Sequence, residues 1–102
     1  MIVRVYRCTA ATDRETEVAN MLRETTPRIR AADGCLRVEA GRRLVAQREE
    51  FVVVSLWRDL AAIEAFSRLS GRGSVDEPFF PDRMVGLIQG AAVDHYEGIE
   101  AP

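Results

Sequence analysis

His95 is the only histidine in the chain, and its side chain is the only one whose ordinary pKa lies near neutrality. It is therefore the first candidate for a general base, the group that takes a proton from a substrate. Tyr6 and Arg7 offer a hydrogen-bond donor and a permanent positive charge, which can stabilise a developing oxyanion. Each residue also has a structural interpretation. His95 could be a strand histidine with a structural hydrogen bond, Tyr6 a strand aromatic at the rim, and Arg7 a solvated charge.

Several apolar side chains are candidates to wall a pocket for a flat aromatic molecule. Trp57 could stack on such a molecule, although a tryptophan at the end of a strand more commonly belongs to the core. Phe66, Met21 and Leu22 face inward on two expected helices, so they are core residues that could also line the pocket.

A second aromatic group lies in an expected loop, where Phe79 and Phe80 stand between two prolines. Aromatic side chains in such a loop commonly form a packed lid or an interface anchor. We therefore expect Phe79 and Phe80 to close the pocket or to contact a partner subunit.

The residue types offer little to hold a metal or an organic cofactor. Cys8 and Cys35 have no metal-binding spacing, and together with His95 they supply too few ligands for an ordinary zinc site. The chain also has no glycine-rich phosphate loop. We expect no metal and no flavin, and we expect both cysteines to be free because their strands are not neighbours in the expected sheet.

Composition limits the class of protein. The 102 residues form a single domain, 1–102, and 47% of them are hydrophobic. A net charge of -2 argues against nucleic-acid binding. The longest apolar run, 51–57, is far shorter than the about 20 residues that a membrane helix needs. The N-terminus lacks the apolar stretch of a signal peptide, so a cytoplasmic location is expected. All 14 basic residues are arginine, a bias common in GC-rich bacteria.

Periodicity predicts four strands and two main helices in the order β-α-β-β-α-β. Asp13 is expected to cap the first helix, Pro27 to kink it or divide it near Thr25, and Asp33 and Gly34 to end it. Asp59 is expected to cap the second helix. The expected strands are 2–8, 35–44, 51–58 and 91–99, the helices 13–32 and 59–69, and a short helix 84–88.

The second helix is expected to bury a stripe formed by Leu60, Ile63, Phe66 and Leu69. In the second strand, three apolar residues alternate with two charged ones. The apolar residues are Leu36, Val38 and Ala40, and the charged ones are Arg37 and Glu39.

This order predicts an α+β, ferredoxin-like split βαβ fold, a four-stranded antiparallel sheet with both helices on one face. The third strand is apolar on both sides, whereas a sheet covered on one face normally alternates apolar and polar residues. Val52, Val54 and Leu56 therefore face a surface that no element of this chain covers. A homodimer formed through the helix-free sheet face is the simplest cover.

Three segments resemble the antibiotic-biosynthesis-monooxygenase-like proteins of the dimeric α+β barrel superfamily. They are Gly34-Cys35-Leu36, the run from Val53 to Phe66, and Val93-Asp94-His95-Tyr96-Glu97. The resemblance implies the same fold and dimer over nearly the whole chain. It is weaker for chemistry, because one scaffold hosts oxygenases, haem-degrading enzymes, isomerases and proteins of no known activity.

Within that superfamily, the haem-degrading branch uses an asparagine on the first strand and a histidine near the second helix. This chain has neither, which disfavours haem degradation but leaves haem binding through His95 open. The quinone-forming branch carries a tryptophan at the position matched by Trp57 and uses no cofactor. The resemblance thus favours an oxidoreductase, a cofactor-independent monooxygenase that oxidises an aromatic, polycyclic phenol with O₂.

Two alternatives stay open at this point. One is a haem-binding protein or an isomerase on the same scaffold. The other is a non-catalytic dimer that binds a small molecule or acts in stress response. A cavity that contains His95, Tyr6 and Trp57 would favour an enzyme, whereas a space between sheet and helices that is filled by side chains would favour the non-catalytic dimer.

Overall fold

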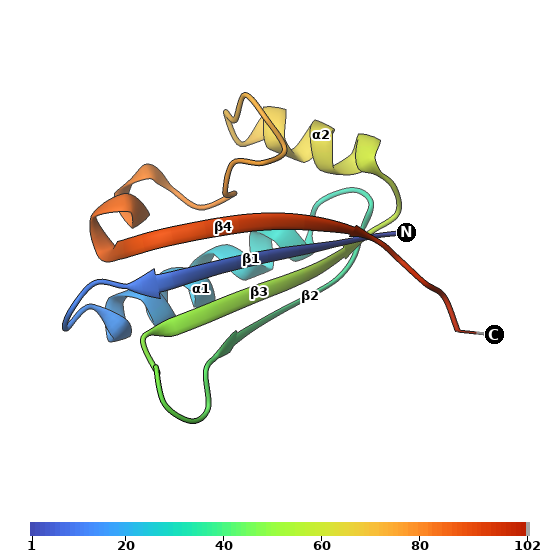
Figure 1. Ribbon diagram of the computed structural model, residues 1–102. Coiled ribbons are helices and arrows are strands. Elements are labelled where there is room, and N and C mark those ends of the chain that lie inside the picture. Colours follow the sequence, from blue (N-terminus) through green and yellow to red (C-terminus); the bar gives the residue numbers. More distant parts are fainter. Residues whose placement is uncertain (102) are drawn as a thin grey trace.

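A computed structural model describes residues 1–101 of the chain, so Pro102, the last residue of the expected domain, lies outside the described residues. The elements follow the expected order, with one 3-10 helix, η1, before the last strand (Figure 1). They are β1 (Ile2–Ala10), α1 (Glu15–Arg30), β2 (Cys35–Arg42), β3 (Glu50–Trp57), α2 (Leu60–Leu69), η1 (Asp82–Leu87) and β4 (Ile88–Glu97). The four strands form one sheet in the order β2-β3-β1-β4, and every neighbouring pair is antiparallel. The ferredoxin-like fold is thereby confirmed.

The core lies between the helices and one face of the sheet. Because strand side chains alternate between two faces, every second residue of β1 and β3 points toward the helices. On β3 these are Phe51, Val53, Ser55 and Trp57, all buried. Phe51, Val53 and Trp57 pack in one cluster with buried residues of α1 and α2, such as Val18 and Ile63. One shared core for both helices means that they cover the same face of the sheet.

The first helix differs from its expected form at both the N-terminus and the proline. Its N-cap residue is Arg14, which makes no side-chain capping bond, and Asp13 instead adopts a left-handed backbone with φ 64°. The expected cap at Asp13 is therefore wrong; aspartate tolerates this conformation, which turns the chain before the helix begins. Pro27 lies inside an α1 that is assigned as one helix, so it does not divide the helix. Gly34, with φ 86°, turns the chain after the helix as expected.

The second helix begins as expected but buries less of its stripe. The Asp59 carboxylate accepts a hydrogen bond of 2.9 Å from the backbone N–H of Ala62, which confirms the cap. Ile63 and Phe66 are buried, whereas Leu60 and Leu69 are exposed. The two leucines are the first and last residues of a ten-residue helix, whose buried residues lie between them.

The outer strands also differ from expectation in detail. The pairing of β2 with β3 shifts between Cys35 and Arg37, and this irregularity leaves Leu36 exposed instead of buried beside Val38. Ala40 is exposed as well, because β2 is an edge strand. The expected short helix is a 3-10 helix, and β4 begins at Ile88 and ends at Glu97. Among the described residues, no helix is long and apolar enough to cross a membrane.

The second face of the sheet carries no helix. On this face Val5 of β1 pairs with Val54 of β3, and Val3 pairs with Leu56. Val52, Val54 and Leu56 are only partly buried, which agrees with the expectation that they point away from the helices. We call the surface formed by Val3, Val5, Val52, Val54 and Leu56 the free sheet face.

Candidate active site

Arg4 of β1 is a charged side chain buried between the sheet and the segment that follows α2; it is 2% exposed. Its guanidinium donates to the carbonyl of Val75 and, from Nη2 at 2.8 Å, to the carbonyl of Glu77. The guanidinium carbon also lies 3.8 Å from the centre of the Phe79 ring, a cation–π contact. Within the described residues no carboxylate lies within 4.0 Å of Arg4. Its positive charge is therefore stabilised by the two carbonyl dipoles and by the face of the Phe79 ring. Burial lowers the pKa of Arg4 to about 10, and the Asp76 carboxylate acts in the opposite direction.

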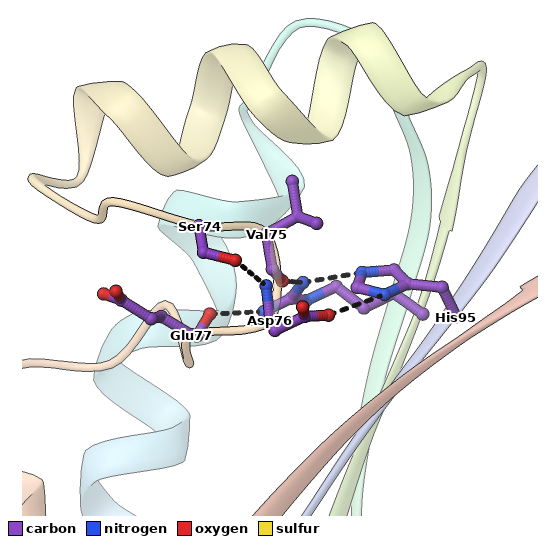
Figure 2. Close-up of polar contacts among 6 residues, drawn as sticks. Ser74, Val75, Asp76, Glu77 and His95 are labelled. Carbon is purple, nitrogen blue, oxygen red and sulfur yellow. Dashed lines mark hydrogen bonds and ion pairs between the residues drawn. The ribbon is translucent and has the colours of Figure 1, made fainter.

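His95 lies next to Arg4 because the two residues are register partners in the pairing of β1 with β4. Arg4 Nη1 is 2.8 Å from His95 Nε2, and since a guanidinium only donates, Nε2 accepts this hydrogen bond. The proton of the neutral ring then resides on Nδ1, which faces the Asp76 carboxylate at 3.9 Å. Figure 2 shows the imidazole reaching toward the segment that contains Asp76.

The surroundings of His95 favour its neutral form. Burial lowers the pKa of His95, and the positive charge of Arg4 lowers it further. The carboxylates of Asp76 and Asp94 raise it, but the net shift is downward. His95 is therefore a neutral base at physiological pH, which a proton acceptor requires.

Tyr6 lies two residues after Arg4 on the same strand face and is buried. Its ring packs against Phe80, with ring centroids 4.8 Å apart. The Tyr6 hydroxyl is buried without a hydrogen-bond partner among the described residues. Burial raises its pKa, and the neighbouring Cys8 thiol adds to the shift, although a thiol is too weak a partner to satisfy the hydroxyl. The phenol thus stays protonated, as an unused donor.

Three aromatic rings fill the space beside Arg4. Phe79 packs edge-on against Phe66 with centroids 4.8 Å apart, and Trp57 lies 5.7 Å from Phe66 and 5.9 Å from Phe79. Trp57 is fully buried, and its indole N–H donates to the Ser55 hydroxyl at 2.8 Å. Trp57 is therefore a core residue in this structure, and its ring is not exposed to a ligand. Phe79 and Phe80 are buried against their own chain, as expected of a lid rather than of a contact with a partner.

The segment that carries Phe79 and Phe80 is held by arginines that donate to its backbone carbonyls. Arg4 donates to the carbonyls of Val75 and Glu77, Arg28 of α1 donates to that of Phe79 at 2.8 Å, and Arg72 donates to that of Phe80. We call residues 74–80 the covering segment. It contains no helix or strand, so these bonds and the two buried phenylalanines hold it over Arg4.

Three of the expected site residues lie elsewhere. Arg7 points to the free sheet face, where its side chain is exposed and 3.4 Å from Asp94, so it cannot reach a molecule beside Tyr6 and His95. Met21 and Leu22 are buried on α1, and they line two separate surface grooves that do not include His95. The structure therefore does not set Arg7, Met21 and Leu22 beside His95.

Arg4 was missed because arginines are usually solvated, and the chain has fourteen of them. A signal was present: Arg4 shares its strand face with Tyr6 and Cys8, positions that alternation assigns to the core. A charged residue on the inward face of a central strand is rare unless its charge is used or compensated.

The interior beside Arg4 is filled. The four best-defined surface grooves on the described part of the chain are not lined by Tyr6, Trp57 or His95. A space between sheet and helices that is filled by side chains favours a non-catalytic protein. A substrate could enter this space only if the covering segment moved. Among residues 1–101, no group of three or more His, Cys, Asp or Glu side chains is placed to hold a metal ion.

Comparison with known proteins supplies the family. The sequence profile of antibiotic biosynthesis monooxygenases matches residues 1–71. The chain belongs to this family. A search of proteins with curated descriptions finds no significant match.

Solved structures agree with the family's fold. A candidate antibiotic biosynthesis monooxygenase from Deinococcus radiodurans superposes with a TM-score of 0.83 at 21% identity, covering 100% of this chain and 96% of its own. PA3566 from Pseudomonas aeruginosa gives 0.75 at 21% identity, with 97% and 94% covered. A variant of MhuD with two manganese protoporphyrin IX molecules per active site gives 0.70 at 16% identity, with 100% and 98% covered. At these identities the similarity establishes the fold of this family member, not its chemistry.

Proposed function

We propose that this protein is a cofactor-independent monooxygenase that oxidises a flat phenolic or polycyclic aromatic molecule with O₂. The observation that carries the proposal is Arg4, a buried guanidinium without a carboxylate partner, in hydrogen-bond contact with a neutral histidine. A buried charge without an ion-pair partner costs free energy, and such groups concentrate at functional sites. An anionic substrate would supply the missing negative charge.

The chemistry follows from what each side chain can do. Oxygen reacts directly only with an electron-rich form of the substrate, which is its deprotonated anion. His95 would take the proton on Nε2 as the guanidinium of Arg4 moves from that atom to the substrate oxygen, and Arg4 and the unused Tyr6 hydroxyl would stabilise the resulting oxyanion. For a ring CH₂ group beside a phenol, CH₂ + O₂ gives C=O + H₂O. One oxygen atom enters the product, and the other leaves as water.

The covering segment must open for this reaction. Phe79 now lies where a flat ring would stack between Arg4 and Phe66. The carbonyls of Val75 and Glu77 occupy the donors that an oxyanion would use. A phenolate could replace these contacts, with its oxygen on Arg4 in place of the two carbonyls and its ring in place of the Phe79 ring. The segment would therefore act as a lid that substrate displaces.

The test is oxygen consumption by the purified protein with a panel of anthrones, naphthols and hydroquinones. Under ¹⁸O₂, one labelled oxygen atom should appear in the product and the other in water. Arg4→Gln should abolish turnover, whereas Arg68→Gln, on an exposed position of α2, should not change it. Because Arg4→Gln also removes buried contacts, its fold is checked by circular dichroism. His95→Gln provides a second, milder variant.

A second candidate function is that of a non-catalytic dimer that binds a small molecule. The filled space between Trp57, Phe66 and Phe79 favours it. In that case a phenol would bind without oxygen uptake, and ¹⁸O would not enter it. Haem binding through His95 has weaker support, because iron would have to displace Arg4 from Nε2.

We also propose that the protein is a homodimer in which the free sheet face is the interface. Four valines and a leucine on β1 and β3, among them Val52 and Val54, would otherwise leave a contiguous apolar surface in water. A stable contact of this kind buries more than about 1,000 Å² in total. The helices and the covering segment lie on the opposite face of the sheet, so the Arg4 site of each protomer would stay clear of the dimer interface (Figure 1).

A further inference from the structure

A groove of about 430 Å³ runs between α1 and β2, away from Arg4 and His95. One wall is a single face of α1, from Ala19 to Arg30, and the other is the edge strand β2 from Glu39 to Arg42. Leu22 and Phe51, both buried in the core, contribute apolar surface to the groove. On the β2 side of the groove, the inward-facing residue between Val38 and Arg42 is Ala40, whose side chain is too small to fill it.

Three arginines line this groove: Arg23 and Arg30 on α1, and Arg42 on β2. Arg23 and Arg30 are two helical turns apart, about 10 Å along the axis. Arg42 faces them from the sheet, where its guanidinium carbon lies 5.4 Å from the centre of the Phe51 ring. The groove therefore combines an apolar floor with positive charge on both walls.

None of the three charges is neutralised within the described part of the chain. Arg23 donates to the amide oxygen of Asn20 at 2.8 Å, and Arg42 donates to the carbonyl of Arg48, both neutral acceptors. Arg30 has no carboxylate within 4.0 Å.

The acidic residue that lines the groove does not offset the arginines. Glu39 is 3.4 Å from Arg37, and both side chains belong to the opposite face of β2.

The gathering of these arginines is not a consequence of overall charge, since the protein carries a net charge of -2. Seven arginines have a carboxylate within 4.0 Å, and three of the other seven line this one groove. The unpaired positive charge is thus concentrated where an apolar surface is also open to a ligand.

We propose that this groove binds a small organic carboxylate with a flat apolar body. The guanidinium fork matches the two oxygens of a carboxylate, and Phe51 and Leu22 offer an apolar surface to the ring system. Its volume falls in the range of ordinary small-molecule sites, about 300 to 1,000 Å³. This second site is independent of the oxygenase proposed above, because it shares no residue with the Arg4 cluster.

The probe for this site is 2-naphthoate, titrated into the ¹⁵N-labelled full chain at low salt while backbone amide shifts are followed by NMR. We expect saturable shifts in residues 19–30 and 39–42. Arg30→Gln and Arg42→Gln should each weaken binding about three- to tenfold. Ala40→Leu should block the groove sterically. Arg68 is an exposed helical arginine outside the groove, so the Arg68→Gln variant should bind 2-naphthoate as tightly as the wild-type protein does.

Methyl 2-naphthoate keeps the ring but lacks the charge, and it should bind much more weakly than the acid. Equal binding of the ester would overturn the proposal, and so would an absence of shifts. Shifts confined to residues 74–80 would place the ligand at the Arg4 site and would also overturn it. Loss of oxygenase activity would leave this result unaffected, since the titration needs no turnover.

Discussion

Replacing His95 by alanine and by glutamine separates its two roles, that of a base and that of a hydrogen-bond acceptor for Arg4. Glutamine offers a side-chain oxygen that can accept from the guanidinium, but it cannot take up a proton. Alanine does neither. If the proposed chemistry holds, both variants lose turnover and only the alanine variant loses stability.

The expected loss of stability follows from the 2.8 Å contact between Arg4 Nη1 and His95 Nε2. A hydrogen bond to a charged group contributes about 1.5 to 3 kcal/mol. The His95 side chain is 19% exposed, so water can partly replace it, and the lower end applies. We expect His95→Ala to lower the free energy of unfolding by about 1.5 kcal/mol, or the melting temperature by roughly 6–12 °C in a domain of this size. His95→Gln should stay within about 0.5 kcal/mol of the unchanged protein.

The expected loss of turnover is set by the role of a general base, which contributes roughly 10²- to 10⁴-fold. Oxygen consumption with the best substrate of the panel measures it, and thermal unfolding by circular dichroism measures stability on the same samples. Arg68→Gln serves as the matched control for both measurements.

Full turnover in His95→Gln would show that the imidazole is not the base. The Arg4–His95 cluster would then be structural, and the non-catalytic dimer would become the better account. An alanine variant as stable as the unchanged protein would instead refute the hydrogen-bond magnitude, because Arg4 would not depend on Nε2.

Three further predictions concern pH, the free sheet face and the lid. Because the pKa of His95 is lowered in the folded state, the unfolded chain takes up the proton first as the pH falls below about 6.5. The contribution of His95 is therefore fully present above that pH and is lost toward the lower folded-state pKa. Urea unfolding across this range should show the loss in the unchanged protein and not in His95→Gln. Val54→Asp, at the centre of the free sheet face, should convert the dimer to a monomer in sedimentation; a folded monomer of the unchanged protein at micromolar concentration would contradict the proposed interface. Phe79→Ala should lower the free energy of unfolding by about 3 kcal/mol, since its ring is buried against Arg4 and Phe66, and an unchanged urea midpoint would argue that the covering segment is not closed in solution.

The cofactor state gives one more prediction. The purified protein should carry no flavin, metal or stoichiometric haem, as measured by its absorption spectrum and by metal analysis. A Soret band that titrates to one haem per chain, with haem turnover in the presence of a reductant, would overturn the cofactor-independent mechanism.

Much of the fold followed from local patterns in the sequence. The alternation in residues 51–57 and the cap at Asp59 are properties of neighbouring residues, so they identify β3 and the start of α2 without reference to the rest of the chain. The element order then implied one antiparallel sheet with both helices on one face. The cap at Asp13 and the burial of Leu60 and Leu69 were predicted wrongly, because the backbone at the turn and the extent of cover depend on what packs nearby.

The candidate site could be predicted only in part. The sequence named His95 and Tyr6 by residue type, and the structure sets both on the strand face that points toward the covering segment. The sequence analysis named Arg7 and missed Arg4, although alternation along the strand sets Arg4 on the same face as Tyr6; with fourteen arginines in the chain, only the strand pairing that sets Arg4 opposite His95 shows which one is used. The covering segment has no periodicity, so its position over Arg4 depends on tertiary contacts, which are the hydrogen bonds from Arg4, Arg28 and Arg72 and the packing of Phe79 and Phe80. The residue types thus determined the fold and the available chemistry, whereas the register of β1 with β4 and the packing of Phe79 decided which arginine meets the histidine and how the interior is closed.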